Sequence, residues 1–155
     1  MDKILIIDDD ESMRDTLKLF LMDSNYELLL AENGIVGIKM LDKFHPDIII
    51  TDLVMPKVSG YDVLRESKKV DKNINVIVLS AFDDMSRTIK AIQLGAYDYL
   101  TKPIEQERLK LIISRALESK KLNERIISTI TDQTEVYKRE TSLIGHTQGM
   151  KEIYK

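Results

Sequence analysis

Short runs of apolar residues recur along much of the sequence, and each run is too short to form a helix. Continuous apolar runs of this length are typical of strands that are buried on both faces of a parallel sheet. The central run holds Ile48, Ile49 and Ile50, and it ends in the carboxylate of Asp52. We therefore predict strands at residues 3–7, 26–31, 46–52, 74–79 and 97–100.

Between these runs the apolar residues recur at the spacing of one helical face, as Met13, Leu17, Phe20 and Leu21 do. The first helix is predicted to follow a cap at Asp10 and to end near residues 24–25. Further helices are predicted from residue 33 to residue 44, over 62–69, over 85–93 and from 105 onward. Strands that alternate with helices in this way predict an α/β protein, with a doubly wound, five-stranded parallel sheet and right-handed crossovers.

Length and composition limit the class of protein. The chain has 155 residues, 43% of them hydrophobic and 32% charged, which describes a globular protein with one substantial core. No apolar run approaches the roughly 20 residues of a spanning helix, and no secretory signal is present. We therefore expect a cytoplasmic protein without membrane contact. The net charge of −3 argues against direct nucleic-acid contact from this segment.

Polar side chains follow four of the predicted strands at their carboxyl ends. Asp8 and Asp9 follow the first strand, Asp52 ends the third, Ser80 ends the fourth and Lys102 follows the fifth. In a parallel sheet these ends lie at the edge where ligands bind. Adjacent carboxylates repel one another unless a cation lies among them, and oxygen ligands suit Mg²⁺. Carboxylates, Mg²⁺, a lysine and a hydroxyl together indicate phosphoryl transfer, with a carboxylate oxygen as nucleophile.

Four motifs in the sequence resemble those of the receiver domain of bacterial two-component response regulators. They lie at residues 4–10, 47–56, 76–81 and 99–103, and the resemblance covers roughly residues 2–120. It implies a flavodoxin-like (βα)5 fold. It also implies that the protein is a regulatory phosphoacceptor and not an enzyme. It also implies phosphorylation by a sensor histidine kinase, with Mg-dependent phosphotransfer and autodephosphorylation intrinsic to the domain.

The resemblance assigns roles residue by residue. Asp52 corresponds to the phosphoacceptor, and Mg²⁺ is held by Asp8, Asp9, Asp52 and the backbone carbonyl of Val54. Lys102 corresponds to the lysine that pairs with the phosphoryl group, and its bond to Pro103 is expected to be cis. Ser80 and Tyr99 correspond to the switch residues. Lys57 departs from the family, in which glycine is common at this position.

A second resemblance points to one class within the family. Residues 91–103 are similar to receivers of the nitrogen-regulator (NtrC) class, and residues 143–154 look like the opening of the AAA+ ATPase domain of that class. We therefore expect a receiver at 1–120, a helical linker at 121–141 and the start of a truncated ATPase domain at 142–155. The implied full-length protein is a sigma-54-dependent transcriptional activator, whose ATPase and DNA-binding domains act with sigma-54 RNA polymerase.

The predicted linker has an apolar pattern of its own. Leu109, Ile112 and Ala116 continue into Ile126 and Ile130 in a broken heptad register. The receiver core accounts for burial up to about residue 117, but not for the isoleucines beyond it. We therefore predict a coiled coil that makes the chain a homodimer.

Two alternatives remain open at this point. Asp8 and Asp10 after an apolar strand also resemble the first motif of haloacid-dehalogenase-type phosphatases, with Asp8 as nucleophile of a Mg-dependent reaction. That interpretation leaves Asp52 and Lys102 without a role. The other alternative is a degenerate receiver that acts only as a binding module, although all the residues that phosphorylation requires are present.

Overall fold

The computed structural model describes the backbone of residues 1–81 and 83–141, and the side chains of residues 1–81 and 83–125. Five parallel strands form one sheet in the order β2-β1-β3-β4-β5. The strands are β1 (Asp2–Ile7), β2 (Tyr26–Ala31), β3 (Ile48–Asp52), β4 (Asn75–Ser80) and β5 (Asp98–Thr101). The predicted fold, a doubly wound α/β sheet of flavodoxin-like topology, is confirmed.

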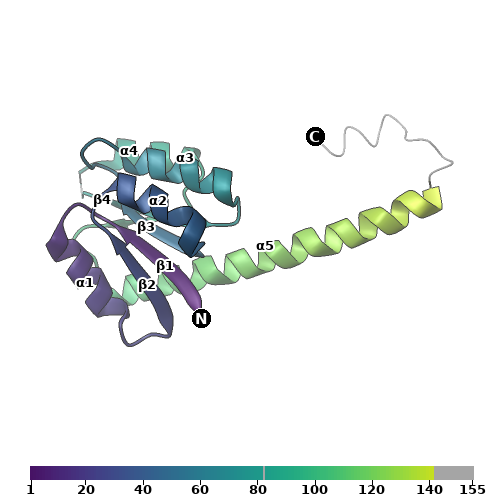
Figure 1. Ribbon diagram of the computed structural model, residues 1–155, viewed down its shortest axis with the longest axis horizontal. Coiled ribbons are helices and arrows are strands. Elements are labelled where there is room, and N and C mark those ends of the chain that lie inside the picture. The colour runs from purple at the N-terminus through teal and green to yellow at the C-terminus, as the bar shows by residue number, and fades with distance from the viewer. Residues whose placement is uncertain (82, 142–155) are drawn as a thin grey trace. The chain divides into compact units, whose positions relative to one another are not determined.

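Helices cover both faces of the sheet (Figure 1). The helices are α1 (Glu11–Leu21), α2 (Gly34–Phe44), α3 (Gly60–Val70), α4 (Met85–Gln93) and α5 (Gln106–Thr141). On β1, Ile4 and Ile6 pack with α1 and the start of α5, whereas Leu5 and Ile7 pack with α2, α3 and α4. Because both faces are covered, the interiors of β1, β3 and β4 are fully buried, which explains their continuous apolar runs, whereas the two edge strands β2 and β5 are only partly buried.

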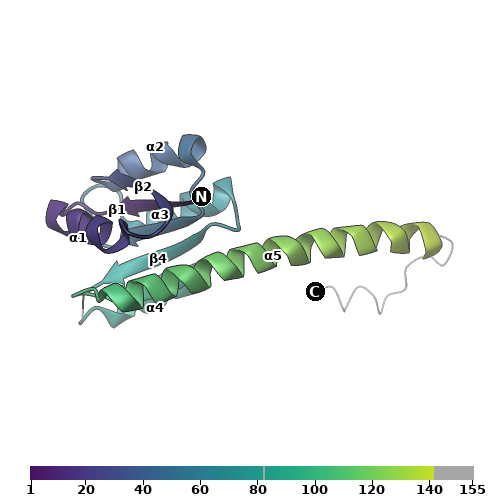
Figure 2. The ribbon, with the colours of Figure 1, turned by 90° about the horizontal axis from the view of Figure 1, so that it is seen from below.

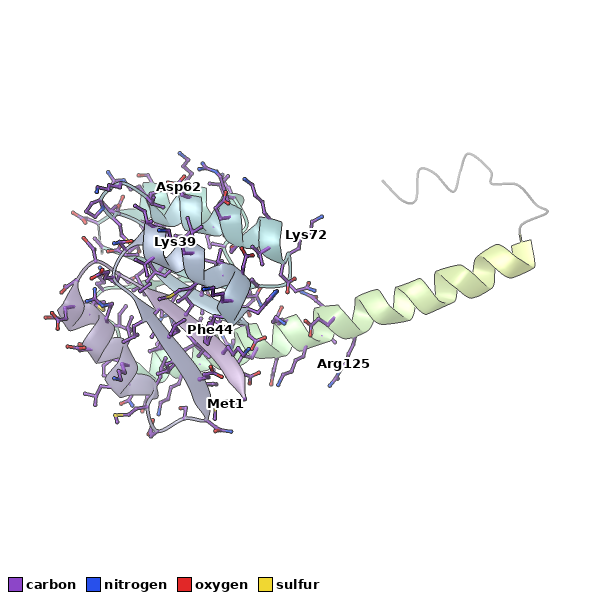
Figure 3. The ribbon with its side chains drawn as sticks, in the orientation of Figure 1. Met1, Lys39, Phe44, Asp62, Lys72 and Arg125 are labelled. Atoms are coloured by element: carbon purple, nitrogen blue, oxygen red, sulfur yellow. The ribbon has the colours of Figure 1, made fainter. Side chains whose placement is uncertain are left out.

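The helix ends follow local capping chemistry. The Asp10 carboxylate accepts a hydrogen bond from the backbone N–H of Ser12, so the predicted cap of α1 is confirmed. Helix α1 ends at Leu21, earlier than the predicted end near residues 24–25. The reason is a turn, in which the Ser24 N–H donates to the Leu21 carbonyl at 3.1 Å before β2 begins. At α3, Ser59 and Asp62, which is labelled in Figure 3, form a reciprocal capping box.

Helix α5 belongs to two parts of the chain, because the contacts divide the protein into the compact units Met1–Lys120 and Lys121–Lys155. Within the first unit, α5 buries its apolar face against the sheet through Leu109, Ile112, Ile113, Ala116 and Leu117. Figure 2 shows the start of the helix running alongside β4. The side chains of the isoleucines predicted to pair chains, and the predicted ATPase start at 142–155, lie outside the described residues.

Among the residues that the structure describes, none of the helices combines the length and the apolar character that crossing a membrane requires.

Candidate functional site

Three carboxylates meet at the carboxyl edge of the sheet. Asp8 and Asp9 follow β1, Asp52 ends β3, and one oxygen of each lies within 4.8 Å of the others. Strands β1 and β3 are neighbours, while the chain crosses to β2 on the other side of β1. The cluster therefore occupies the crevice at the point where the strand order reverses, which is the usual ligand site of such sheets.

Lys102 brings a positive charge into this cluster. Its Nζ lies 3.2 Å from Oδ2 of Asp52 and 3.8 Å from Oδ2 of Asp8. The side chain reaches the site from the segment after β5, where the Lys102 N–H donates to the Ser80 carbonyl at 2.9 Å. The Lys102–Pro103 peptide bond is cis, as the family resemblance implies. One ammonium thus faces three carboxylates, so the cluster retains a negative balance.

Asp8 is the fully buried member of the cluster. Burial is the largest influence on its carboxyl and raises the pKa from 3.8 to about 6. The Asp10 N–H, which donates to Oδ1 at 2.9 Å, and the Lys102 charge both lower this pKa, whereas the charges of Asp52 and Asp9 raise it. Oδ2 of Asp8 is buried without a hydrogen-bond partner. A buried oxygen without a donor has the character of a cation ligand.

The loop from β3 to α3 holds Asp52 through close backbone contacts. The Gly60 N–H donates to the Leu53 carbonyl at 2.9 Å, and a Cβ at Gly60 would clash with the carbonyl oxygen of Asp52. Only glycine permits this approach. Lys57 lies in the same loop with φ of 69°, the left-handed conformation that glycine adopts without strain. The loop therefore keeps a glycine-like conformation at Lys57, although a lysine occupies the position.

The expected metal ligand Val54 and the expected switch residues lie around the same edge. The Val54 N–H donates to Oδ1 of Asp52 at 3.4 Å, and Val54 as a whole is 54% exposed. Ser80 ends β4 with its Oγ buried and without a hydrogen-bond partner. Tyr99 lies on β5, half-buried against the core formed with α2, α3 and α4. Ser80 thus has an unused hydroxyl one strand away from Asp52.

Two positively charged side chains at this edge were not assigned to the site from the sequence. Arg14 donates from Nη1 to the Asp8 carbonyl at 2.7 Å. Arg14 and Lys57 also line an open cavity of about 430 Å³ beside Asp9, together with Glu11, Glu32, Asn33, Ile35 and Pro56. Nothing in the sequence distinguishes Arg14 from other polar residues of an amphipathic helix, and the contact follows from the fold.

Asp10 does not join the cluster. Its side chain is exposed and caps α1, and the residues that collect around Asp8 are Asp9, Asp52 and Lys102. The phosphatase alternative needs Asp10 as acid and base near the nucleophile. The structure gives that alternative no support.

The parallel sheet, together with the three aspartates and the lysine at its carboxyl edge, defines a class of protein. Residues 4–114 match the family model of the response regulator receiver domain. The chain belongs to this family and is a receiver domain of two-component signalling.

The chain is also similar to individual proteins and solved structures. The chain is 36% identical to the DNA-binding transcriptional regulator NtrC of Bradyrhizobium sp. (strain RP501 Parasponia) over 98% of this chain and 31% of that protein. Among solved structures, it resembles a response regulator receiver domain protein of Clostridium thermocellum, with a TM-score of 0.75, 36% identity and coverage of 79% of this chain and 98% of that one. It also resembles NtrX of Brucella abortus, with a TM-score of 0.78, 28% identity and coverage of 83% and 30%. The chain spans about a third or less of the regulators AtoC and NtrC that it matches, at 27% and 31% of their lengths.

Proposed function

We propose that Asp52 accepts a phosphoryl group from a sensor histidine kinase, or from a small acyl phosphate. The observation that supports this most is the position of the Lys102 ammonium, 3.2 Å from Oδ2 of Asp52 and within 4 Å of Asp8. A carboxylate oxygen at a strand end, next to a fixed cation, combines a nucleophile with a group that stabilises phosphoryl charge. The side chain of Asp52 is 14% exposed, so it is sheltered but reachable.

The residues present also fit Mg²⁺. Asp8, Asp9 and Asp52 supply oxygen ligands, the Val54 carbonyl is the proposed backbone ligand, and the Asp8 oxygen without a donor is the orphaned atom that an ion would satisfy. When bound, Mg²⁺ would offset the excess negative charge and neutralise phosphoryl oxygens. Asp8 must be ionised to serve as a ligand, and its pKa of about 6 permits this at neutral pH.

The transfer itself is a substitution at phosphorus. An Asp52 carboxylate oxygen forms the new P–O bond while the bond from phosphorus to the donor's imidazole nitrogen, or to the acyl oxygen, breaks. The leaving group departs with the electron pair, and Lys102 keeps its proton and pairs with the phosphoryl oxygens. We propose that Ser80 then donates its free hydroxyl to the phosphoryl group and that Tyr99 moves with it. Hydrolysis of the aspartyl phosphate returns the domain to its first state.

The whole protein's role is proposed from the resemblance and the relatives. We infer a sigma-54-dependent transcriptional activator in which this receiver controls ATPase and DNA-binding domains that act with sigma-54 RNA polymerase. The match to NtrC over 98% of this chain supports a linker at 121–141 and an ATPase start at 142–155. We also propose that the linker pairs two chains, and that the receiver's phosphorylation acts on this pair.

The phosphorylation proposal is tested by intact-mass measurement after incubation with acetyl phosphate and Mg²⁺. Wild-type protein is expected to gain one phosphoryl group, and Asp52→Asn none. Asp10→Asn is the matched control, because it removes a neighbouring carboxylate that lies outside the cluster and asparagine is an equal helix cap. Labelling that persists in Asp52→Asn, or that Asp10→Asn abolishes, would contradict the assignment.

A further inference from the structure

A polar cluster lies at the amino edge of the sheet, at the opposite end of the strands from the acidic site. Its members are Asp47, immediately before β3, Asn75, the first residue of β4, and Lys120 in α5, the last residue of the first compact unit. We call these three residues the clasp. Figure 3 labels Met1 and Phe44, which lie at this edge, and Lys3 Nζ donates to the Phe44 carbonyl here at 3.2 Å.

Asp47 joins the start of the sheet to the end of the packed part of α5. Oδ2 of Asp47 accepts a hydrogen bond from the Lys3 N–H at 2.8 Å, and Oδ1 lies 3.3 Å from Nζ of Lys120. The Lys120 side chain is 11% exposed and the Asp47 side chain 27%. An ion pair that is this sheltered, and whose carboxylate also accepts from the backbone, is held in one geometry. Breaking it leaves a shielded charge without this partner.

Asn75 holds the preceding turn of the same helix. Its Nδ2 donates to the Ala116 carbonyl at 2.8 Å. A helix carbonyl in this position already faces an N–H of its own helix and accepts a second bond from Asn75. The backbone N–H of Asn75 also donates to the Asp47 carbonyl at 3.4 Å, so the two clasp residues of the sheet are linked to each other. The clasp therefore fixes α5 at two successive turns, at Ala116 and at Lys120.

The two strands that carry the clasp also carry the proposed signalling residues. Strand β3 leads from Asp47 to the acceptor Asp52, and β4 leads from Asn75 to the switch hydroxyl of Ser80. The two strands pair in parallel along their length, and their interiors are fully buried. Closely packed strands of this kind shift as units more readily than they deform internally. A displacement of their carboxyl ends is therefore transmitted to the groups that hold α5.

We propose that the clasp couples the phosphorylation site to the end of α5 where the linker begins. In this device, phosphorylation of Asp52 shifts β3 and β4, and the shift changes how firmly Asp47 and Asn75 hold the turns at Ala116 and Lys120. The inference rests on the proposed phosphorylation of Asp52. It adds the route by which the phosphorylated state reaches residue 121.

Hydrogen exchange of the complete 155-residue chain, measured by mass spectrometry on peptides that cover 114–125, tests the clasp. In Asp47→Asn with Asn75→Ala, exchange there is expected to be about tenfold faster than in wild type, because the anchoring bonds are lost. The matched control is Asp23→Asn. It removes the ion pair between Asp23, in the turn after α1, and Lys110 of α5. The Asp23 carboxylate is 68% exposed, and exposed ion pairs contribute little to stability. Equal exchange in the double variant and wild type would overturn the anchoring role.

The coupling is read from the same peptides after addition of Mg²⁺ and acetyl phosphate. Wild type is expected to change its exchange at 114–125 by a few fold, whereas the double variant should become phosphorylated, by intact mass, without that change. A double variant that responds as wild type does, or a phosphorylated wild type without a response, would overturn the coupling. Absence of the phosphoryl adduct in wild type would overturn the proposed function and the coupling with it. The comparison of unphosphorylated proteins would then still decide the anchoring role.

Discussion

Replacement of Asp8 by asparagine is expected to stabilise the folded protein when Mg²⁺ is absent, although it removes a proposed metal ligand. Asp8 is fully buried, and its pKa is raised from 3.8 to about 6, chiefly by that burial. A raised carboxyl pKa means that the folded state binds the proton more tightly than the unfolded state does. The ionised carboxylate therefore destabilises the fold, and a neutral amide of similar shape avoids this penalty.

The magnitude and its pH dependence follow from that shift. A difference of about two pKa units at about 1.36 kcal/mol each gives roughly 3 kcal/mol. Below the unfolded-state pKa of 3.8 both states hold the proton and the penalty is absent. It grows as pH rises through the window between 3.8 and about 6, and it is fully present above that window. The free energy of unfolding of Asp8→Asn should therefore be higher than that of wild type by up to about 3 kcal/mol at pH 7.5, and by only about 1 kcal/mol at pH 4.5.

Urea unfolding in EDTA at both pH values provides the measurement. At typical m values of about 1–3 kcal/mol per molar urea, the expected difference at pH 7.5 shifts the midpoint by about 1 M or more. With saturating Mg²⁺ the order should reverse, since ion binding stabilises wild type and not the variant. Asp10→Asn changes only an exposed capping side chain outside the cluster and keeps the backbone N–H that donates to Asp8, so it should show neither effect. Equal stabilities at pH 7.5 in EDTA, or a gain of the same size at pH 4.5, would refute the electrostatic account of Asp8.

Two further predictions concern the loop after Asp52 and the linker. Lys57→Gly should raise the free energy of unfolding by about 1 kcal/mol, because lysine is strained at φ of 69° and glycine is not, whereas Lys57→Ala should bring no such gain. Chemical denaturation checks this, and a glycine variant no more stable than the alanine variant would contradict it. Sedimentation should show residues 1–155 as a dimer at tens of micromolar and residues 1–120 as a monomer, since burial of linker isoleucines is worth roughly 1.5–3 kcal/mol per side chain. A monomeric long form, or a short form that pairs equally well, would exclude the linker as the dimer contact.

Most of the fold could be predicted because the three inner strands are buried on both faces. A run such as residues 48–50 lacks the polar positions that a surface helix or an edge strand would expose to solvent. The apolar pattern alone therefore indicates a buried strand of a parallel sheet. The convergence of Asp8, Asp52 and Lys102 then follows, because parallel strands end at one edge. Helix ends were less predictable. The turn that ends α1 at Leu21 depends on one hydrogen bond from Ser24, and the apolar spacing does not encode it.

The contacts that could not be predicted join residues far apart in the chain. Asn75 donates to Ala116, 41 residues away, and Asp47 pairs with Lys120. Taken from the sequence alone, Asp47 and Asn75 are ordinary polar residues where strands begin, and Lys120 is an ordinary polar residue within a helix. Arg14 at the acidic site is a similar case. Such contacts require the crossing geometry of α5 or α1 against the sheet, which periodicity does not provide.

The acidic site leaves part of its negative charge without a balancing positive charge from the protein. Three carboxylates share one ammonium at this edge, and the most buried of them, Asp8, keeps an oxygen without a hydrogen-bond donor. A fold selected for stability alone would have paired or replaced that carboxylate. In the proposed function this unmet charge favours Mg²⁺, because the cation would replace repulsion among the carboxylates with attraction, whereas the anionic phosphoryl group would depend on that cation and on Lys102. The electrostatic penalty that weakens the free domain at neutral pH would then also be the source of its affinity for the cation that the proposed phosphorylation requires.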